Sequence, residues 1–210
     1  MKTFKVYRDY YDVGCDIILK DEITLTPGLT VLVGCNGAGK TTLIQQLQGV
    51  LRSQDVEFIE HSNLHAGQKA EVERLAFYNE FEKLATVVQS SEGENIVFIL
   101  GNVAKKIGEL VRKTEQKEIF VFLDATDSGL SIDNVIEIKD FFRFAQENDP
   151  HKEFYFIVSA NEYEMANGEQ CFDVRTGEYT TFEDYEDFRR FVLDSRAFKD
   201  SRKYKRRSGR

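Results

Sequence analysis

The sequence is poor in residues that staple or anchor a domain: its 210 residues include no tryptophan, two prolines and three cysteines. Cys15, Cys35 and Cys171 are widely separated and odd in number, and no Cys/His cluster has zinc-like spacing. We therefore expect reduced thiols and a cytoplasmic protein. The N-terminus lacks the apolar core of a secretion signal, and no apolar run approaches the roughly 20 residues of a membrane-spanning helix. Direct membrane insertion is accordingly not expected.

Positive charge is also scarce outside the C-terminus. The chain has 28 lysines and arginines against 36 acidic residues, a formal net charge of −8. Residues 196–210 hold eight lysines and arginines and one aspartate, which is +7, so residues 1–195 carry −15. An acidic body matches a nucleic-acid backbone poorly, whereas the basic segment can contact phosphate. We expect one domain over residues 1–195 and a basic, disordered tail over residues 196–210, with nucleic acid as a candidate partner of the tail.

Strands alternating with helices through the middle of the chain predict an α/β core. The first 33 residues are β-rich, and a late hairpin turns at Thr176-Gly177, so an antiparallel layer should accompany that core. A weakly amphipathic helix is expected over 67–89. The other predicted strands are 3–7, 15–20, 22–25, 30–34, 56–60, 118–124 and 154–160, and the other helices are 40–52, 92–112, 133–148 and one carrying Phe182 to Val192.

The strongest chemical signal is a glycine-rich loop that follows a predicted strand and opens a predicted helix, with the sequence GCNGAGKTT. Glycines let consecutive N–H groups turn toward phosphate oxygens, and the helix N-terminus adds partial positive charge. Lys40 should reach the β- and γ-phosphates and Thr41 should offer its hydroxyl to Mg²⁺. The motif predicts binding of a nucleoside triphosphate. Its residues are Gly34, Cys35, Asn36, Gly37, Ala38, Gly39, Lys40, Thr41 and Thr42.

Two further segments have residues suited to phosphate and metal chemistry. Asp124 ends the apolar strand predicted over 118–124, a position from which a carboxylate reaches Mg²⁺. Ser91 precedes a predicted helix and is spaced as a capping box with Glu94. The same helix start can alternatively bind a γ-phosphate from a second subunit, and the two interpretations are compatible.

Together these segments resemble the ATP-binding cassette (ABC) ATPases. The phosphate loop is typical of the family, SSEGE resembles its signature motif with Ser91 and Gly93 retained, and LDATDSGLS resembles its Walker B strand and D-loop. The similarity covers roughly residues 3–190. It implies a P-loop NTPase fold of ABC type, with a mixed central sheet, an N-terminal antiparallel β layer and a reduced helical subdomain. It also implies ATP and Mg²⁺ as ligands and a homodimer in which Ser91 and Gly93 face the partner's γ-phosphate.

The departures from the family pattern concern catalysis. Ala125 stands where the family has its catalytic glutamate, Asn161 stands at the switch histidine, and Glu92 replaces a signature glycine. Ser131 also replaces an aspartate of the D-loop. The Q-loop glutamine has several candidate positions, namely Gln68, Ser62 and Asn63.

Three accounts of hydrolysis follow from these departures. In the first account the chain binds ATP, dimerises and hydrolyses ATP slowly, because a missing general base costs a factor of about 100 to 10,000 in rate. Alternatively, another carboxylate substitutes: Glu92 acting in trans, or Asp127 in the same loop as Ala125. In the third account hydrolysis is absent and ATP is purely structural. The implied function is an ATP-dependent dimerisation switch, resembling non-transporter cassettes of nucleic-acid maintenance or of phages and mobile elements. A transporter subunit and an ATP-dependent interaction module are the alternatives.

Overall fold

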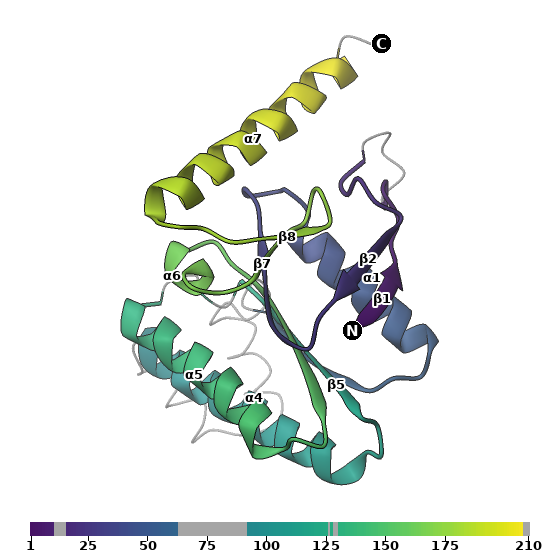
Figure 1. The fold of residues 1–210 in the computed structure, drawn as a ribbon, viewed down its shortest axis with the longest axis vertical. Coiled ribbons are helices and arrows are strands. Elements are labelled where there is room, and N and C mark those ends of the chain that lie inside the picture. The colour runs from purple at the N-terminus through teal and green to yellow at the C-terminus, as the bar shows by residue number, and fades with distance from the viewer. Residues whose placement is uncertain (11–15, 63–91, 126, 128–129, 208–210) are drawn as a thin grey trace, which may run out of the picture.

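The computed structural model describes residues 1–10, 16–62, 92–125, 127 and 130–207. Its centre is a six-stranded sheet in which five strands are parallel and the last is antiparallel, confirming the expected mixed α/β fold (Figure 1). In spatial order the strands are β4 (Phe58–Ser62), β5 (Glu118–Asp124), β6 (Glu153–Ser159), β3 (Gly28–Val33), β7 (Cys171–Asp173) and β8 (Glu178–Thr180).

One face of this sheet is covered by helix α1 (Lys40–Ser53) and by a two-stranded antiparallel sheet of β1 (Lys2–Lys5) and β2 (Glu22–Leu25). Side chains alternate across a strand, so every second residue of the buried strands faces this layer. Phe120, Phe122 and Tyr155 do so, and they pack with Leu43 and Leu47 of α1 in one apolar cluster. This is the expected antiparallel layer at the N-terminus.

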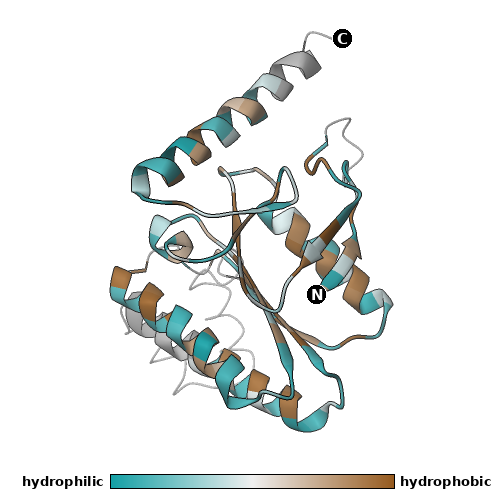
Figure 2. Ribbon diagram, viewed as in Figure 1, coloured by the Kyte–Doolittle hydropathy of each residue, from teal (hydrophilic) through white to brown (hydrophobic). Residues whose placement is uncertain are grey.

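The opposite face packs against two longer helices, α4 (Glu92–Lys113) and α5 (Ile132–Asn148). Val121, Leu123 and Phe156 point to this side and join Ile138 and Phe142 of α5 in a second cluster. Figure 2 shows hydrophobic and hydrophilic residues mixed along α5. Of its hydrophobic residues, Val135, Ile138 and Phe142 are buried, whereas Ile132, Ile136 and Phe144 are exposed. Buried strands between two such layers read as continuous apolar runs, which is why the sequence locates them well.

Two helices complete the carboxyl-terminal part: the single turn α6 (Tyr163–Ala166) after β6, and α7 (Tyr185–Arg207). Figure 1 shows α7 as a long helix that crosses the end of the sheet where the phosphate loop lies. Among the residues that the structure describes, no helix is both long and apolar enough to cross a membrane.

Two of the expectations about local structure are wrong. Residues 16–20 form bends and coil instead of the expected strand, with Ile18 fully buried. The basic segment from Arg196, expected to be a disordered tail, continues α7 as far as Arg207. No glycine or proline interrupts Tyr185–Arg207, so the helix can extend through the charged residues. The weak helix expected over 67–89, and with it the reduced helical subdomain, lies outside the described residues.

Candidate nucleotide site

The carboxyl ends of β3, β6 and β5 bring the predicted motifs to one edge of the sheet. The phosphate loop follows β3 and Asp124 ends β5, with β6 hydrogen-bonded between these two strands. Ligands of open α/β sheets bind at this edge. The sequence motifs that were predicted separately are therefore part of one site.

Glycine is required in the phosphate loop by backbone conformation and by close packing. Gly34, Gly37 and Gly39 have φ values of 147°, 75° and 108°, which side chains disfavour. A Cβ on Gly39 would lie 2.1 Å from Cγ2 of Ile17, and one on Gly34 would lie 2.9 Å from Cβ of Ala38. Neither position therefore has room for a side chain.

Lys40 begins α1 and its ammonium group turns back to the loop, donating to the Gly34 carbonyl oxygen at 2.8 Å. Burial lowers the pKa of Lys40 from its ordinary value, and the Lys199 charge acts in the same direction. The acidic groups of Asp127 and Asp124 oppose this shift. A buried cation beside mixed charges is well placed to exchange a carbonyl oxygen for a phosphate oxygen.

The start of α1 provides backbone donors as well. The N–H of Leu43 donates to the Gly39 carbonyl at 2.8 Å, so the N–H groups of Lys40, Thr41 and Thr42 precede the first intrahelical bond. Thr42 is buried and Thr41 is half-buried. Asn36 and Gly37 are exposed at the tip of the loop, whereas Cys35 is buried beneath it.

Asp124 is held by Ser159, which ends β6. The Ser159 hydroxyl donates to Oδ1 of Asp124 at 2.5 Å, and its oxygen accepts the N–H of Ala125 at 2.7 Å. All three residues are buried. One hydroxyl therefore fixes both the expected metal ligand and the backbone that follows it.

Ala125 has a left-handed backbone, with φ of 55°, and only 4% of its surface is exposed. Non-glycine residues rarely adopt this conformation. The residue where the family places its catalytic glutamate is thus a small side chain turned into a packed environment.

Asp127 lies in the same loop but contacts the segment after β6. Its Oδ2 accepts the N–H groups of Asn161 at 2.6 Å and Glu162 at 2.8 Å. Within the described part of the chain, Oδ1 is buried without a hydrogen-bond partner. Burial raises the pKa of Asp127 above its ordinary value of 3.8, against the effect of these two N–H donors.

The remaining predicted residues are placed only in part. Glu92 and Gly93 begin α4, while Ser91 lies outside the described residues. Ser62, a candidate for the Q-loop position, pairs with Asp124 in the β4–β5 register, so it ends the strand next to the expected metal ligand. Gln68 and Asn63 also lie outside the described residues.

Sequence reasoning missed three residues at this edge. Ser159 was missed because the sequence does not give the order of the strands in the sheet. A polar residue at the carboxyl end of an apolar strand was nevertheless a usable signal. Ser195 accepts the Cys35 N–H at 3.2 Å, and Lys199 donates to the Asn36 carbonyl oxygen, both from α7. Neither had a sequence signal: Ser195 is a single serine in a helix with no motif around it, and Lys199 lies in the segment that was expected to be a tail.

Comparison with known proteins agrees with this geometry. A family model described as an AAA domain matches residues 16–205. The chain belongs to the AAA domain family. The ribose import ATP-binding protein RbsA 1 of Agrobacterium fabrum (strain C58 / ATCC 33970) is 34% identical over 128 residues, which is 57% of this chain and 23% of that protein. The match thus spans under a quarter of the relative, and together with the motifs it identifies an ABC-type ATPase domain that binds ATP.

The residues of this AAA domain fit the ATP and Mg²⁺ that its family implies. The available donors are the Lys40 ammonium group and the N–H groups at the start of α1, which suit phosphate. Thr41 and Asp124 would hold Mg²⁺, since their oxygen atoms are the kind of ligand that this metal prefers. When bound, the metal would neutralise charge on the phosphate oxygens.

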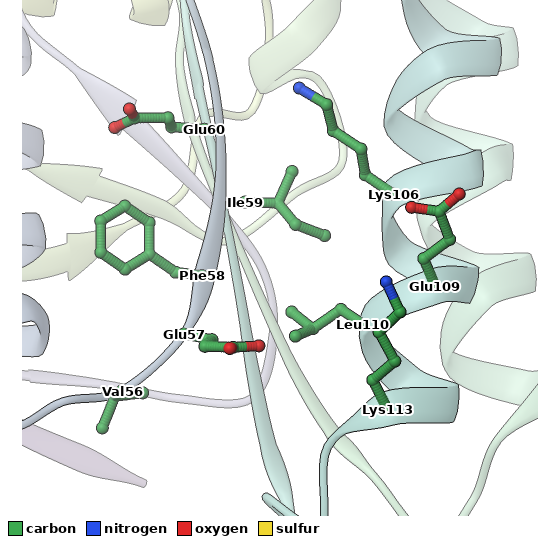
Figure 3. Close-up of a pocket in the computed structure, with 9 residues that line it drawn as sticks. All are labelled: Val56, Glu57, Phe58, Ile59, Glu60, Lys106, Glu109, Leu110 and Lys113. Carbon is green, nitrogen blue, oxygen red and sulfur yellow. The ribbon is translucent and has the colours of Figure 1, made fainter.

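A groove of about 530 Å³ lies elsewhere on the AAA domain, between β4 and α4 (Figure 3). Residues 56–60 form one wall, and Lys106, Glu109, Leu110 and Lys113 form the other. Strands β5 and β6 separate β4 from the strand that carries the phosphate loop. This groove is therefore distinct from the nucleotide site.

Proposed function

We propose that this AAA domain is an ATP-dependent dimerisation switch that hydrolyses ATP slowly. The observation that carries the proposal is the structure around Ala125: a buried, left-handed alanine follows Asp124, the expected metal ligand, so no carboxylate occupies the usual position of the general base. ATP would be held by the phosphate loop, with Thr41 and Asp124 holding Mg²⁺. A second copy would complete the site through its own Ser91 and Gly93.

Asp127 is better suited to positioning than to activating water. Its Oδ2 already accepts two backbone N–H groups, and the side chain is fully buried. We propose that it fixes the backbone position of Asn161, the residue at the switch position, at the end of β6. A base role for Asp127 would require this pair of hydrogen bonds to break.

Glu92 is the other acid proposed to act, in trans, on water beside the partner's γ-phosphate. Glu92 begins α4. A helix start that faces a phosphate ordinarily has neutral hydrogen-bond donors, because a carboxylate repels the phosphate. We therefore propose a chemical role for the acid at this position. Glu92→Gln should lower phosphate release by about 100-fold or more if Glu92 is the base. Unchanged release would remove Glu92 from the mechanism and leave slow, unassisted hydrolysis.

The central experiment measures solution mass by light scattering with and without Mg-ATP, while phosphate release is followed in the same sample. A dimer that forms only with Mg-ATP and releases little phosphate is the expected result. Lys40→Ala is the matched control and should remain monomeric. A wild-type chain that stays monomeric while binding ATP would contradict the dimer switch, and rapid steady release would contradict slow hydrolysis.

A role in nucleic-acid maintenance, or in phage and mobile-element biology, is proposed from the basic end of α7. Residues 202–207 contain Arg202, Lys203, Lys205, Arg206 and Arg207. Salt-sensitive DNA or RNA binding that is lost on truncation after Ser201 would support it, since phosphate contacts weaken as salt rises. Equal binding by the truncated chain would contradict it.

A nucleotide-binding subunit of a transporter is the second candidate, favoured by the similarity to an import ATP-binding protein. This candidate function predicts that the chain co-purifies with a membrane protein. That protein would bind the groove between β4 and α4, or the helices that face away from the phosphate loop. Isolation of the chain from its host as a homodimer, with no membrane protein bound, would exclude it.

A further inference from the structure

Helix α7 contacts the phosphate loop at two points that are one helical turn apart. Ser195 accepts the Cys35 N–H at 3.2 Å, and Lys199 donates to the carbonyl oxygen of Asn36. Residues four apart lie on the same face of a helix, so a single face of α7 makes both contacts. The guanidinium of Arg175 lies 4.7 Å from the ring centroid of Phe198, which fixes the helix between these two points.

Two lysines donate hydrogen bonds to the phosphate loop, one from the start of α1 and the other from α7. Lys40 donates to Gly34 and Lys199 donates to Asn36, two residues further along. The Lys199 ammonium nitrogen lies 3.6 Å from the position that a Cβ on Gly37 would take. Gly37 is exposed at the loop tip, so this second ammonium group lies beside the exposed end of the phosphate loop.

We propose that Lys199 is a second phosphate-binding cation, which α7 of the same chain supplies to the bound triphosphate. A hydrogen bond between an ammonium group and a phosphate oxygen is stronger than one to a neutral carbonyl, so Lys199 gains by exchanging Asn36 for the nucleotide. Two neighbouring ammonium groups also repel each other until an anion lies between them. The inference rests on ATP binding at this loop and goes beyond it.

The contact couples the nucleotide to the position of α7. Because Lys199 bonds the loop in cis, any ligand that gains from this lysine must favour the docked helix over an undocked one. The β- and γ-phosphates carry most of the negative charge, so the contribution of Lys199 should be larger for ATP than for AMP. ATP binding by wild type should also be more sensitive to salt than ATP binding by Lys199→Ala, because wild type has one more charge pair at the surface.

The test compares dissociation constants for ATP and AMP, measured by calorimetry, in wild type, Lys199→Ala and Lys199→Gln. Both variants should bind ATP about 10- to 100-fold more weakly and bind AMP nearly as wild type does. Lys199→Gln keeps a donor for the Asn36 carbonyl but removes the charge, so weak ATP binding by this variant identifies the charge as the cause. Arg196→Ala, an exposed cation one turn away on the same helix, is the control and should bind as wild type does.

Several outcomes would overturn the proposal. ATP binding by Lys199→Ala that equals or exceeds wild type would show that the lysine only fastens the helix, or blocks the site. Recovery of wild-type affinity in Lys199→Gln would show that the Asn36 hydrogen bond matters and the charge does not. Failure of wild type to bind ATP would overturn the ATP site itself. ATP binding that is the same in wild type and in the Lys199 variants would overturn only the role of Lys199.

Discussion

The Ser159 hydroxyl donates to Oδ1 of Asp124 at 2.5 Å and accepts the N–H of Ala125 at 2.7 Å. It joins the end of β6 to the end of β5, where the expected metal ligand Asp124 is followed by Ala125.

Ser159→Ala should lower the free energy of unfolding by about 1–3 kcal/mol, because a buried N–H and a buried carboxylate each lose a partner. Urea denaturation measures the change. Ser53→Ala, which removes an exposed hydroxyl bonded to the Val50 carbonyl, is the control and should change stability by less than about 0.5 kcal/mol. Equal effects of the two substitutions would contradict the bridging role.

Asp127→Asn should change the pH dependence of stability. The folded-state pKa of Asp127 is raised above its ordinary value of 3.8, so the native state holds this proton more tightly than the unfolded state does. Between the ordinary and the raised pKa, Asp127 therefore makes stability fall as pH rises, by at most about 1.4 kcal/mol per pH unit. The wild-type stability minus that of Asp127→Asn should decrease across this window and be constant above it. A difference that rises with pH would contradict burial as the dominant cause.

Gly39→Ala should destabilise the chain by about 2 kcal/mol or more, through left-handed strain and the 2.1 Å contact with Ile17. Ile17→Ala removes the contacting methyl group, so the double variant should be less destabilised than the sum of the single variants by about 1 kcal/mol or more. Thermal and urea unfolding of all four proteins gives this coupling. Gly49→Ala in α1, where a Cβ meets nothing within 4 Å, should instead be stabilising. Simple additivity would contradict the contact.

Ala125→Gly should leave stability unchanged or raise it by up to about 1 kcal/mol, since glycine adopts a φ of 55° without strain. Ala125→Glu should lower stability by about 1–3 kcal/mol, because it places a carboxylate at a buried position. Phosphate release by Ala125→Glu tests the site separately: it should rise if the other groups are competent for hydrolysis. A stable Ala125→Glu variant would show that the loop opens easily.

Local patterns predicted the elements of the fold that depend on nearby residues alone. The glycine loop, the apolar strand ending at Asp124 and the amphipathic helix from Lys40 were all recognisable, since backbone geometry and side-chain periodicity determine them locally. The strand predicted over 15–20 was wrong because Ile17 and Ile18 are apolar for another reason, namely packing. Ile17 lies against Gly39, and Ile18 is buried in the core.

The candidate site was predictable where a motif names its own residues and not where long-range packing supplies a partner. Ser159 reaches Asp124 only because β6 lies between β3 and β5, an order that no single segment encodes. Lys199 reaches Asn36 across 163 positions of sequence, from a helix whose charge suggested a solvated tail. Such contacts depend on how elements are arranged in space, which periodicity does not report.

The position of β6 between the two motif-bearing strands has a consequence for how this chain can change over evolution. Seven residues, Glu153–Ser159, set the distance along which Ser159 reaches Asp124 and Asn161 reaches Asp127. Most of these residues can be exchanged for other apolar ones without moving either contact. Insertion or deletion of one residue within the strand would turn the side chains on one side of the change to the opposite face. Length, more than identity, is therefore what selection must preserve in this strand.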